Sequence, residues 1–357
     1  MDTMHQVPGN FRPLMPHKFS TPKRRRNFVA PLASLAPALL TFLIVGVGVF
    51  SIPTVLATDL KLAIAEPPKD PFPVTVDPIN EVITEDPTVE ALLEETHGER
   101  AAALGFVGGA FSWLANLIVS VPGYQQIAGS SIAFVEIKPG YREEEVAYVF
   151  GQELGWSAKE QAEFLKQVHT EEPELSEGEF VPGTYMVSGA ANATYVQELL
   201  SDRFKKDILA RYSTTTEELV PVEEMLTIAS MLERETRDPA EMRLISGIIW
   251  NRLWAGMNLQ IDATLQYAKA TKSKTGSWWP KVVPNDKYVK SEYNTYKYGG
   301  LPPGPISNPS TAAVLAALNP KKTDCLFYFH DKYGEMHCTE NYKEHVRLLK
   351  KYYGQGK

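Results

Sequence analysis

The feature that most constrains this chain is an apolar run without a single charge, from Phe28 to Ala57. Its 30 residues include ALLTFLIVGVGVFSI, and about 20 apolar residues in a helix are enough to cross a bilayer. Basic residues precede the run, whereas residues 59–100 carry 11 acids and 3 bases, a net charge of −8. The positive-inside rule therefore predicts a cytoplasmic tail at 1–27, a transmembrane anchor at 28–57 and export of the chain beyond the anchor.

Two features leave alternatives to this topology. The run could be a cleaved signal peptide, although the apolar core of such a peptide is normally about 7–15 residues long. A second uncharged stretch, residues 101–135, contains LGFVGGAFSWLANLIVSVP and is also long enough to cross. Its Gly, Ser and Asn residues and its unbiased flanks favour a membrane-associated or packing element at 101–130. A second span would return the rest of the chain to the cytoplasm, so reporter fusions have to decide the topology.

Composition excludes several classes of protein. The net charge of −7 gives no support to nucleic-acid binding, which needs clustered Lys and Arg. The two cysteines, Cys325 and Cys338, are too few for a disulfide scaffold. They flank LFYFHDKYGEMH, an alternating segment with a Gly-containing turn, so a disulfide across a hairpin and two free thiols both remain open. Motifs for metals and phosphates are lacking, so we expect no metal and no cofactor.

The sequence between residues 58 and 200 predicts a linker followed by a small module. Residues 58–100 hold six prolines and an excess of acids, which is typical of an extended, self-repelling linker with one short helix at TVEALLEE. At 131–200 a β-type run (SIAFVEIKPG) precedes two helical segments, and a strand in EGEFVPGTYMV closes the module. The second helix begins at Ser157 with Glu160 three residues on, a capping-box pattern.

The remaining residues, 201–352, are expected to form the domain that carries the chemistry. A charged helical connector comes first, followed by helices at VEEMLTIASMLERE and PAEMRLISGIIWNRLWAG. A loop-rich middle and the apolar hairpin at 325–340 complete it. Helices mixed with short strands in this order predict an α+β fold class.

Two carboxylates close the first of these helices, in the stretch TIASMLERET. At 100° per residue, Glu233 and Glu235 both fall inside the apolar arc of the helix, whereas Thr227, Ser230 and Arg234 form a narrow polar face. A surface position for the two acids is therefore disfavoured. They lie about 160° apart around the axis, so they cannot both point into one cleft as the paired carboxylates of an ordinary glycosidase do.

A carboxylate inside an apolar arc must be paired, hydrogen-bonded or neutralised. Burial raises the pKa of a glutamate, which suits a general acid that works near neutral pH. One acid could thus be a catalyst and the other a structural residue, clamped by an arginine such as Arg243 or Arg252. Helical geometry alone does not say which acid has which role.

Three phrases carry a resemblance to a known family. They are LTIASMLERETRDPAEMRLISGIIWNRLWAGMNLQIDATLQY, YNTYKYGGLPPGPISNPSTAAVLAALNP and LFYFHDKYGEMHCTENYKEH. Together they resemble the YceG-like family of endolytic murein transglycosylases over about 130–352. The module at 131–190 resembles the latter part of that family's LysM-like domain. A membrane anchor followed by an external catalytic domain is also the layout of the family.

The resemblance implies roles for individual residues. The family's catalytic acid, the first Glu of its A-S-[IV]-[IV]-E-[KR]-E-T motif, falls on Glu233, and Glu235 becomes a structural or supporting acid. Arg252 is kept as a supporting residue because it could clamp a buried acid. Apart from the resemblance, Trp278 and Trp279 lie beside Pro280 in a polar segment, which favours an exposed rim over core packing. The residues expected to line the substrate cleft are Gln260, Asp262, Tyr293, Asn294, Tyr296, Pro303 and Asn308. Ala263 and Glu292 stand where the family usually has Pro.

The implied reaction cleaves the β-1,4 bond between MurNAc and GlcNAc in a peptidoglycan strand and leaves a 1,6-anhydroMurNAc end. The implied partners are peptidoglycan glycan strands, the cytoplasmic membrane and peptidoglycan synthases. Two alternatives stay open: a peptidoglycan hydrolase that uses Glu233 with Asp262, and a non-catalytic anchored scaffold that binds the wall.

Overall fold

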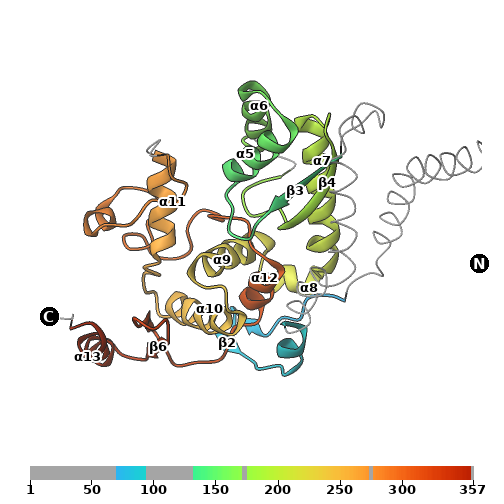
Figure 1. Ribbon diagram of the computed structural model, residues 1–357. Helices are drawn as coiled ribbons and strands as arrows, with labels where there is room; N and C mark the ends of the chain where they lie inside the picture. The colour runs from blue at the N-terminus through green and yellow to red at the C-terminus, as the bar shows by residue number, and fades with distance from the viewer. Residues whose placement is uncertain (1–69, 94–131, 171–174, 273–275, 355–357) are drawn as a thin grey trace, which may run out of the picture. The chain divides into compact units, whose positions relative to one another are not determined.

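The computed structural model describes residues 70–93, 132–170, 175–272 and 276–354 (Figure 1). All of these described residues belong to one compact unit. The strands are β1 (Val76–Asp77), β2 (Val82–Ile83), β3 (Ile132–Ile137), β4 (Gly183–Ser188), β5 (Phe327–His330) and β6 (Met336–Thr339). The helices are α5 (Glu143–Leu154), α6 (Ala158–Val168), α7 (Ala193–Asp207), α8 (Thr214–Leu219), α9 (Val222–Glu235), α10 (Pro239–Trp254), α11 (Asp262–Lys272), α12 (Thr311–Leu318) and α13 (Tyr342–Tyr353), with 3-10 turns η1 (Leu209–Arg211) and η2 (Pro284–Tyr288). This is a mixed α+β architecture, as the sequence predicts.

The predicted cytoplasmic tail, the anchor and the apolar segment at 101–130 lie outside the described residues. None of the helices in the described part of the chain is both long and apolar enough to span a membrane.

The predicted small module has the order β3–α5–α6–β4. Strand β3 pairs antiparallel with β4 over six residue pairs. Aromatic side chains fill the space between this ribbon and the helices: Phe150, Phe164 and Phe180 are fully buried, and the Trp156 indole donates to the Ala191 carbonyl oxygen at 2.8 Å. The capping box of α6 is present as predicted. Helix α7 runs through the predicted boundary at residue 200, so the module and the next segment are joined by a continuous helix.

Helix α9 is the centre of the second half of the chain. Its residues 225–232 are all buried, and α10 and α12 pack against it (Figure 1). The sequence of α12, TAAVLAAL, is apolar on every side, which is typical of a helix buried all round. The predicted polar face of α9 is therefore not solvated. Thr227 and Ser230 are 2% and 0% exposed, and each hydroxyl donates to a carbonyl oxygen of the preceding turn.

Residues 70–93 differ from the extended linker that the prolines and acids predict. The side chains of Phe72, Val76 and Val89 are buried in the core, because apolar residues recur between the polar ones. The Asn319 side-chain amide donates to the Pro73 carbonyl oxygen at 2.8 Å, and the Thr75 N–H donates to the Leu318 carbonyl oxygen at 3.0 Å. The expected short helix begins at residue 88.

The C-terminal hairpin is confirmed, and its cysteines are bridged. Strands β5 and β6 pair antiparallel, and a disulfide joins Cys325 to Cys338. Helix α13 packs aromatic rings on the hairpin, with the ring of Phe329 6.0 Å from that of Tyr352. Of the two alternatives for the cysteines, the structure has the disulfide.

Candidate functional site

Glu233 lies in the last turn of α9 with its side chain half-buried. Its Oε2 accepts two hydrogen bonds from Ser310, one from the backbone N–H at 2.9 Å and one from the hydroxyl at 2.6 Å. Ser310 is the N-cap of α12, and its Oγ also accepts from the Ala313 N–H at 3.3 Å. The predicted acid is thus held at the N-terminus of a buried helix, where backbone N–H groups favour a negative charge.

The loop that leads to Ser310 is tied to α9 at a second place, one turn before Glu233. The Ile306 N–H donates to Ser230 Oγ at 3.0 Å, and the Ser307 hydroxyl donates to the Ser230 carbonyl oxygen at 3.2 Å. The GLPPGPISNPS phrase therefore fixes the N-terminus of α12 against the end of α9. Its prolines fix φ and limit the conformations of the loop.

Glu235 points to a different element. Its Oε2 accepts a hydrogen bond from the Tyr328 hydroxyl of β5 at 2.9 Å. Burial raises the pKa of Glu235, and the nearby charge of Asp262 raises this pKa further, while the bond from Tyr328 lowers it. Burial also raises the pKa of Tyr328 well above its usual value, so the tyrosine stays protonated and is the donor. As the helical wheel predicts, the two acids diverge.

Arg252 and Arg243, the two arginines suggested as a clamp for one of the acids, have other bonding partners. The Arg252 guanidinium donates to backbone carbonyl oxygens instead, those of Leu326 at 2.6 Å and Leu259 at 2.6 Å. Arg243 donates to the Asn319 carbonyl oxygen at 2.9 Å and pairs with Glu90 at 3.4 Å. Arg252 therefore supports the loop that precedes α11, since Leu259 lies three residues before that helix.

Asp262, Tyr296 and Gln260 come together at the start of α11. The Tyr296 hydroxyl donates to Asp262 Oδ1 at 2.6 Å, and Asp262 is exposed. Gln260 is also exposed and has a backbone φ of 56°, the left-handed region that non-glycine residues rarely adopt. Its N–H is held by the Thr295 carbonyl oxygen at 3.0 Å. Strained backbone of this kind clusters at functional sites, which agrees with the predicted role of Gln260 in substrate binding.

Two of the predicted cleft residues have structural roles in this conformation. Asn294 and Asn308 are both 0% exposed. The Asn294 amide donates to the carbonyl oxygens of Lys287 and Val289, at 3.1 and 2.8 Å, and its Oδ1 accepts from the Tyr296 N–H. The Asn308 amide is likewise bonded inside the protein. Neither side chain is exposed to a substrate here, so the predicted contact of Asn294 and Asn308 with the glycan stays a prediction.

Asn308 joins the loop before α12 to the predicted module. Its Oδ1 accepts from the N–H groups of Gly178 and Phe180, both at 2.9 Å. Its Nδ2 donates to the Tyr141 carbonyl oxygen and to Glu177 Oε1, both also at 2.9 Å. Two backbone bonds, at 2.8 and 2.9 Å, bridge the same loop to residues 140 and 141. Burial and the neighbouring Glu143 raise the pKa of Glu177 well above its usual value.

The module also lies directly against the predicted acid. Gly140 has a φ of 79°, and a Cβ atom there would stand 3.0 Å from Arg234 Nη1 and 3.7 Å from Glu233 Cγ. Arg234 stacks on Trp279, with its Cζ atom 3.7 Å from the ring centroid, and the Trp279 indole donates to Glu145 at 3.1 Å. Trp279 is therefore half-buried, and the predicted exposed rim holds only for Trp278, which is 41% exposed.

The Tyr293 hydroxyl lies beside the loop that carries Pro303, since a Cβ atom at Gly304 would stand 3.6 Å from it. Tyr293 is half-buried, and its ring packs 4.7 Å from that of Tyr267. Pro303 is exposed and lines a surface hollow of about 430 Å³ near the start of α9. Glu223 and Glu224 line the same hollow, but Glu233 does not. Of the seven predicted cleft residues, Pro303 thus lines a hollow that Glu233 does not line.

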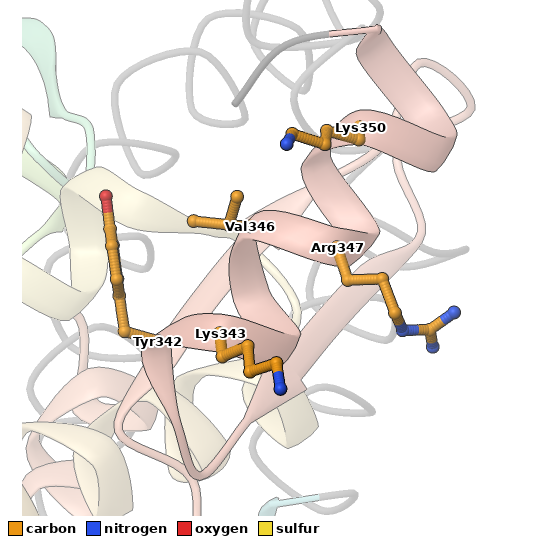
Figure 2. A pocket seen from close by; sticks show the side chains of 5 residues that line it. All are labelled: Tyr342, Lys343, Val346, Arg347 and Lys350. Atoms are coloured by element: carbon orange, nitrogen blue, oxygen red, sulfur yellow. The ribbon is translucent and has the colours of Figure 1, made fainter. Parts of the chain in front are cut away.

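A second hollow, of about 390 Å³, lies on α13 (Figure 2). Its lining residues are Tyr342, Lys343, Val346, Arg347 and Lys350. Three cations and no carboxylate line it, so it offers no general acid. The predicted acid at the end of α9 therefore lines neither of the two hollows.

Within the described residues, two clusters of side chains have a geometry that a cation could use. The first is Asp331, Glu335 and His337, and the second is Glu143, Glu144 and Glu177. Asp331 already accepts from two backbone N–H groups of the β5–β6 turn and is bonded to His337 at 3.1 Å. Neither cluster includes Glu233 or Glu235.

Sequence reasoning missed Ser310 and Tyr328, the two residues that hold the acids. A serine directly before the apolar segment TAAVLAAL is the usual pattern of an N-cap, so the role of Ser310 in starting α12 could have been found. Its bond to Glu233 spans 77 positions and Tyr328's bond to Glu235 spans 93, and neither has a local pattern.

The fold and the site define an α+β protein in which a half-buried acid at the end of one helix is bonded to the N-cap residue of another. A model of the YceG-like family matches residues 114–351, which are 238 of the 357 residues, so the chain belongs to the YceG-like family.

Curated relatives and a solved structure agree with this membership. An endolytic murein transglycosylase of Bacillus subtilis is 39% identical over 133 residues, which cover 37% of this chain and 35% of the relative. One from Streptococcus pneumoniae is 29% identical over 242 residues, 60% of this chain and 44% of the relative. The chain therefore spans less than half the length of these relatives. The crystal structure of a putative YceG-like protein from Listeria monocytogenes matches with a TM-score of 0.54 and 26% identity, covering 63% of this chain and 81% of that one.

Proposed function

We propose that this chain is a membrane-anchored endolytic lytic transglycosylase that uses Glu233 as its single catalytic acid. The observation that carries the proposal is the arrangement at the end of α9: Ser310 holds Glu233 in place, whereas Glu235 turns away to Tyr328. The relatives that match the chain are named endolytic murein transglycosylases. The substrate class is accordingly a peptidoglycan glycan strand.

The reaction needs one carboxyl group in two successive roles. The protonated Glu233 gives its proton to the bridging oxygen while the bond from that oxygen to the MurNAc anomeric carbon breaks. The carboxylate then takes the proton of the 6-hydroxyl of the same MurNAc, whose oxygen bonds to the anomeric carbon. A 1,6-anhydro ring forms, a GlcNAc hydroxyl leaves, and no water is consumed.

The position of Asp262 supports this route over hydrolysis. A hydrolase that protonates with Glu233 would need a second carboxylate flanking the same bond, at roughly 5–9.5 Å. Asp262 bonds instead to Tyr296 and acts electrostatically on Glu235. Exposed Asp262 and Gln260 are available for the hydroxyl and N-acetyl groups of the sugar.

The product distinguishes the three candidate functions. The full-length chain in detergent is incubated with uncrosslinked glycan strands, and the products are separated and identified by mass spectrometry. We expect 1,6-anhydroMurNAc ends from the wild type and none from Glu233→Gln, with unchanged circular dichroism and melting temperature. New reducing ends would instead identify a hydrolase, and intact strands a scaffold. Wild-type turnover by Glu233→Gln would exclude this residue as the acid.

We further propose that residues 28–57 anchor the chain in the cytoplasmic membrane and that the catalytic domain lies outside. The disulfide of Cys325 and Cys338 supports this location, because disulfides persist in oxidising compartments. There the enzyme would meet nascent strands and act as a terminase beside peptidoglycan synthases. Reporter fusions at residue 60 and at the C-terminus test the topology. A cytoplasmic C-terminal reporter would contradict both the location and the substrate.

A further inference from the structure

We infer that Ser310 is a positioning residue for Glu233, one that fixes which carboxyl oxygen carries the catalytic proton. This inference rests on the proposed function, because it assigns a role within the same reaction. Ser310 is 4% exposed, so it acts through Glu233 and does not touch the glycan itself.

The hydrogen-bond directions at Ser310 can be assigned from chemistry. Its backbone N–H can only donate, and it donates to Glu233 Oε2 at 2.9 Å. Its Oγ accepts the Ala313 N–H at 3.3 Å, so its own hydrogen is turned to Glu233 Oε2, 2.6 Å away. Glu233 Oε2 thus accepts two hydrogen bonds from one residue. In the acid form of Glu233 the proton must then be on Oε1.

The element that carries Ser310 is itself fixed on both sides. Ile306 and Ser307 bind Ser230 of α9, and Asn308 makes four side-chain bonds to the module. Ser310 lies two residues beyond Asn308, as the N-cap of a helix whose residues 312–318 are all buried. The donors to Glu233 therefore have little freedom to follow the carboxylate if it moves.

A fixed carboxylate suits the proposed reaction, because one group must first donate and then accept a proton at different atoms of the same sugar. A displacement of about 1 Å can cost on the order of 100-fold in rate. Hydrogen bonds to the carboxylate also stabilise the charged form that exists between the two proton transfers, which is the general effect of donors aimed at developing charge.

Two substitutions of Ser310 separate positioning from helix capping. Ser310→Ala and Ser310→Gly both remove the hydroxyl and keep the backbone N–H. Loss of one hydrogen bond to a charged group should lower kcat about 10–100-fold in both, with KM unchanged because substrate contacts are intact. Only Ser310→Ala should lower the melting temperature clearly, since glycine is a much better N-cap than alanine. Ser310→Thr restores a hydroxyl and should recover part of the lost kcat.

A matched control is Ser157→Ala, which removes the N-cap hydroxyl of α6 in the module. Ser157 bonds to Glu160 on an exposed surface, far along the chain from the acid, so kcat should stay at the wild-type value.

A second measurement, the titration of Glu233, does not depend on turnover. The Glu233 carboxyl is titrated by carbon-13 NMR, with Glu233→Gln to assign its signal. Its titration midpoint should move to higher pH in Ser310→Ala and stay unchanged in Ser157→Ala.

The outcomes separate this inference from the proposed function. If the wild type forms anhydro ends and both hydroxyl-free variants keep its kcat, Ser310 does not position the acid. If the wild type cleaves nothing, the proposed function fails, and the titration alone then decides about Ser310. An unchanged midpoint overturns the inference, and a raised midpoint with lowered kcat supports it. A rise in KM at constant kcat would also overturn it, because it would make Ser310 a binding residue.

Discussion

Replacement of Tyr328 by phenylalanine tests whether Glu235 is a structural acid. The substitution removes the hydroxyl that donates to Glu235 Oε2 at 2.9 Å and leaves the ring in place. A hydrogen bond to a charged group contributes about 1.5–3 kcal/mol to stability and a bond between neutral groups about 0.5–1.5 kcal/mol. The cost of Tyr328→Phe should therefore depend on whether Glu235 is ionised.

The pKa of Glu235 determines whether the cost of Tyr328→Phe rises or falls with pH. Burial raises this pKa in the folded protein, so the contribution of Glu235 to stability is fully present below its unfolded pKa. It is lost as pH rises through the raised folded pKa. The bond from Tyr328 lowers the folded pKa and so reduces that loss. Without the hydroxyl, the loss at high pH becomes larger.

We expect Tyr328→Phe to destabilise the protein by roughly 1 kcal/mol at about pH 4 and by roughly 2–3 kcal/mol at about pH 8. For a unit of this size, each kcal/mol corresponds to about 2–4 °C in melting temperature. Thermal unfolding of the full-length chain at both pH values measures the difference. Turnover on glycan strands should stay within a few-fold of the wild type, because Glu233 and Ser310 are untouched.

Two controls make the result specific. In a Glu235→Gln background the effect of Tyr328→Phe should become small and independent of pH, since the amide oxygen still accepts but carries no charge. Tyr185→Phe also removes a buried hydroxyl, but that hydroxyl donates to the Val181 carbonyl oxygen, so its cost should not vary with pH. An equal cost of Tyr328→Phe at both pH values would refute the argument. Complete loss of turnover by Glu235→Gln, at unchanged stability, would exchange the roles of the two acids.

Two further predictions concern the backbone of the site and the hairpin. Gln260→Gly should stabilise the protein by about 0.5–1 kcal/mol, because glycine adopts the observed φ of 56° without strain, and should raise KM if the side chain binds substrate. An unchanged KM would remove Gln260 from the binding residues. Reduction of the Cys325–Cys338 disulfide should cost about 3 kcal/mol for a loop of this length. A scan with and without dithiothreitol measures this, with Cys325→Ser/Cys338→Ser as the control, and identical scans for the wild type would show that its thiols are free.

Local patterns in the sequence predicted most of the elements that surround the site. The 3.6-residue period placed α9 and α10, and the capping box placed the start of α6. Alternation with a central turn predicted the β5–β6 hairpin. These signals are local because they depend on neighbours within one helix or one strand pair. Residues 70–93 show the limit: prolines and acids predict a solvated linker, and only tertiary packing buries Phe72 and Val89.

The helical wheel was right about the divergence of the two acids but could not name their partners. Geometry within α9 sets the direction in which each side chain leaves the helix. Ser310 and Tyr328 lie on elements that reach α9 only in the folded chain. The same limit applies to Asn294 and Asn308, whose positions in distinctive phrases suggested substrate contact. Both amides are instead fully buried and bonded within the protein. These internal bonds explain why the two loops need an Asn at these positions even if neither side chain touches a ligand.

The contact between the module and the acid determines what must be in place before Glu233 can be held. Ser310 can hold Glu233 only when the loop before α12 is in place, and four of the bonds of that loop come from Asn308 to the module. Glu177, one of these partners, is a carboxyl group whose burial raises its pKa well above the usual value, so its bond to Asn308 offsets part of an otherwise unfavourable burial. The module and the acid are therefore held together by one set of hydrogen bonds and do not move independently of each other. Because the bonds that fix the module also fix the donors to Glu233, a change in the module that breaks them should misplace the acid even where no residue of α9 has changed.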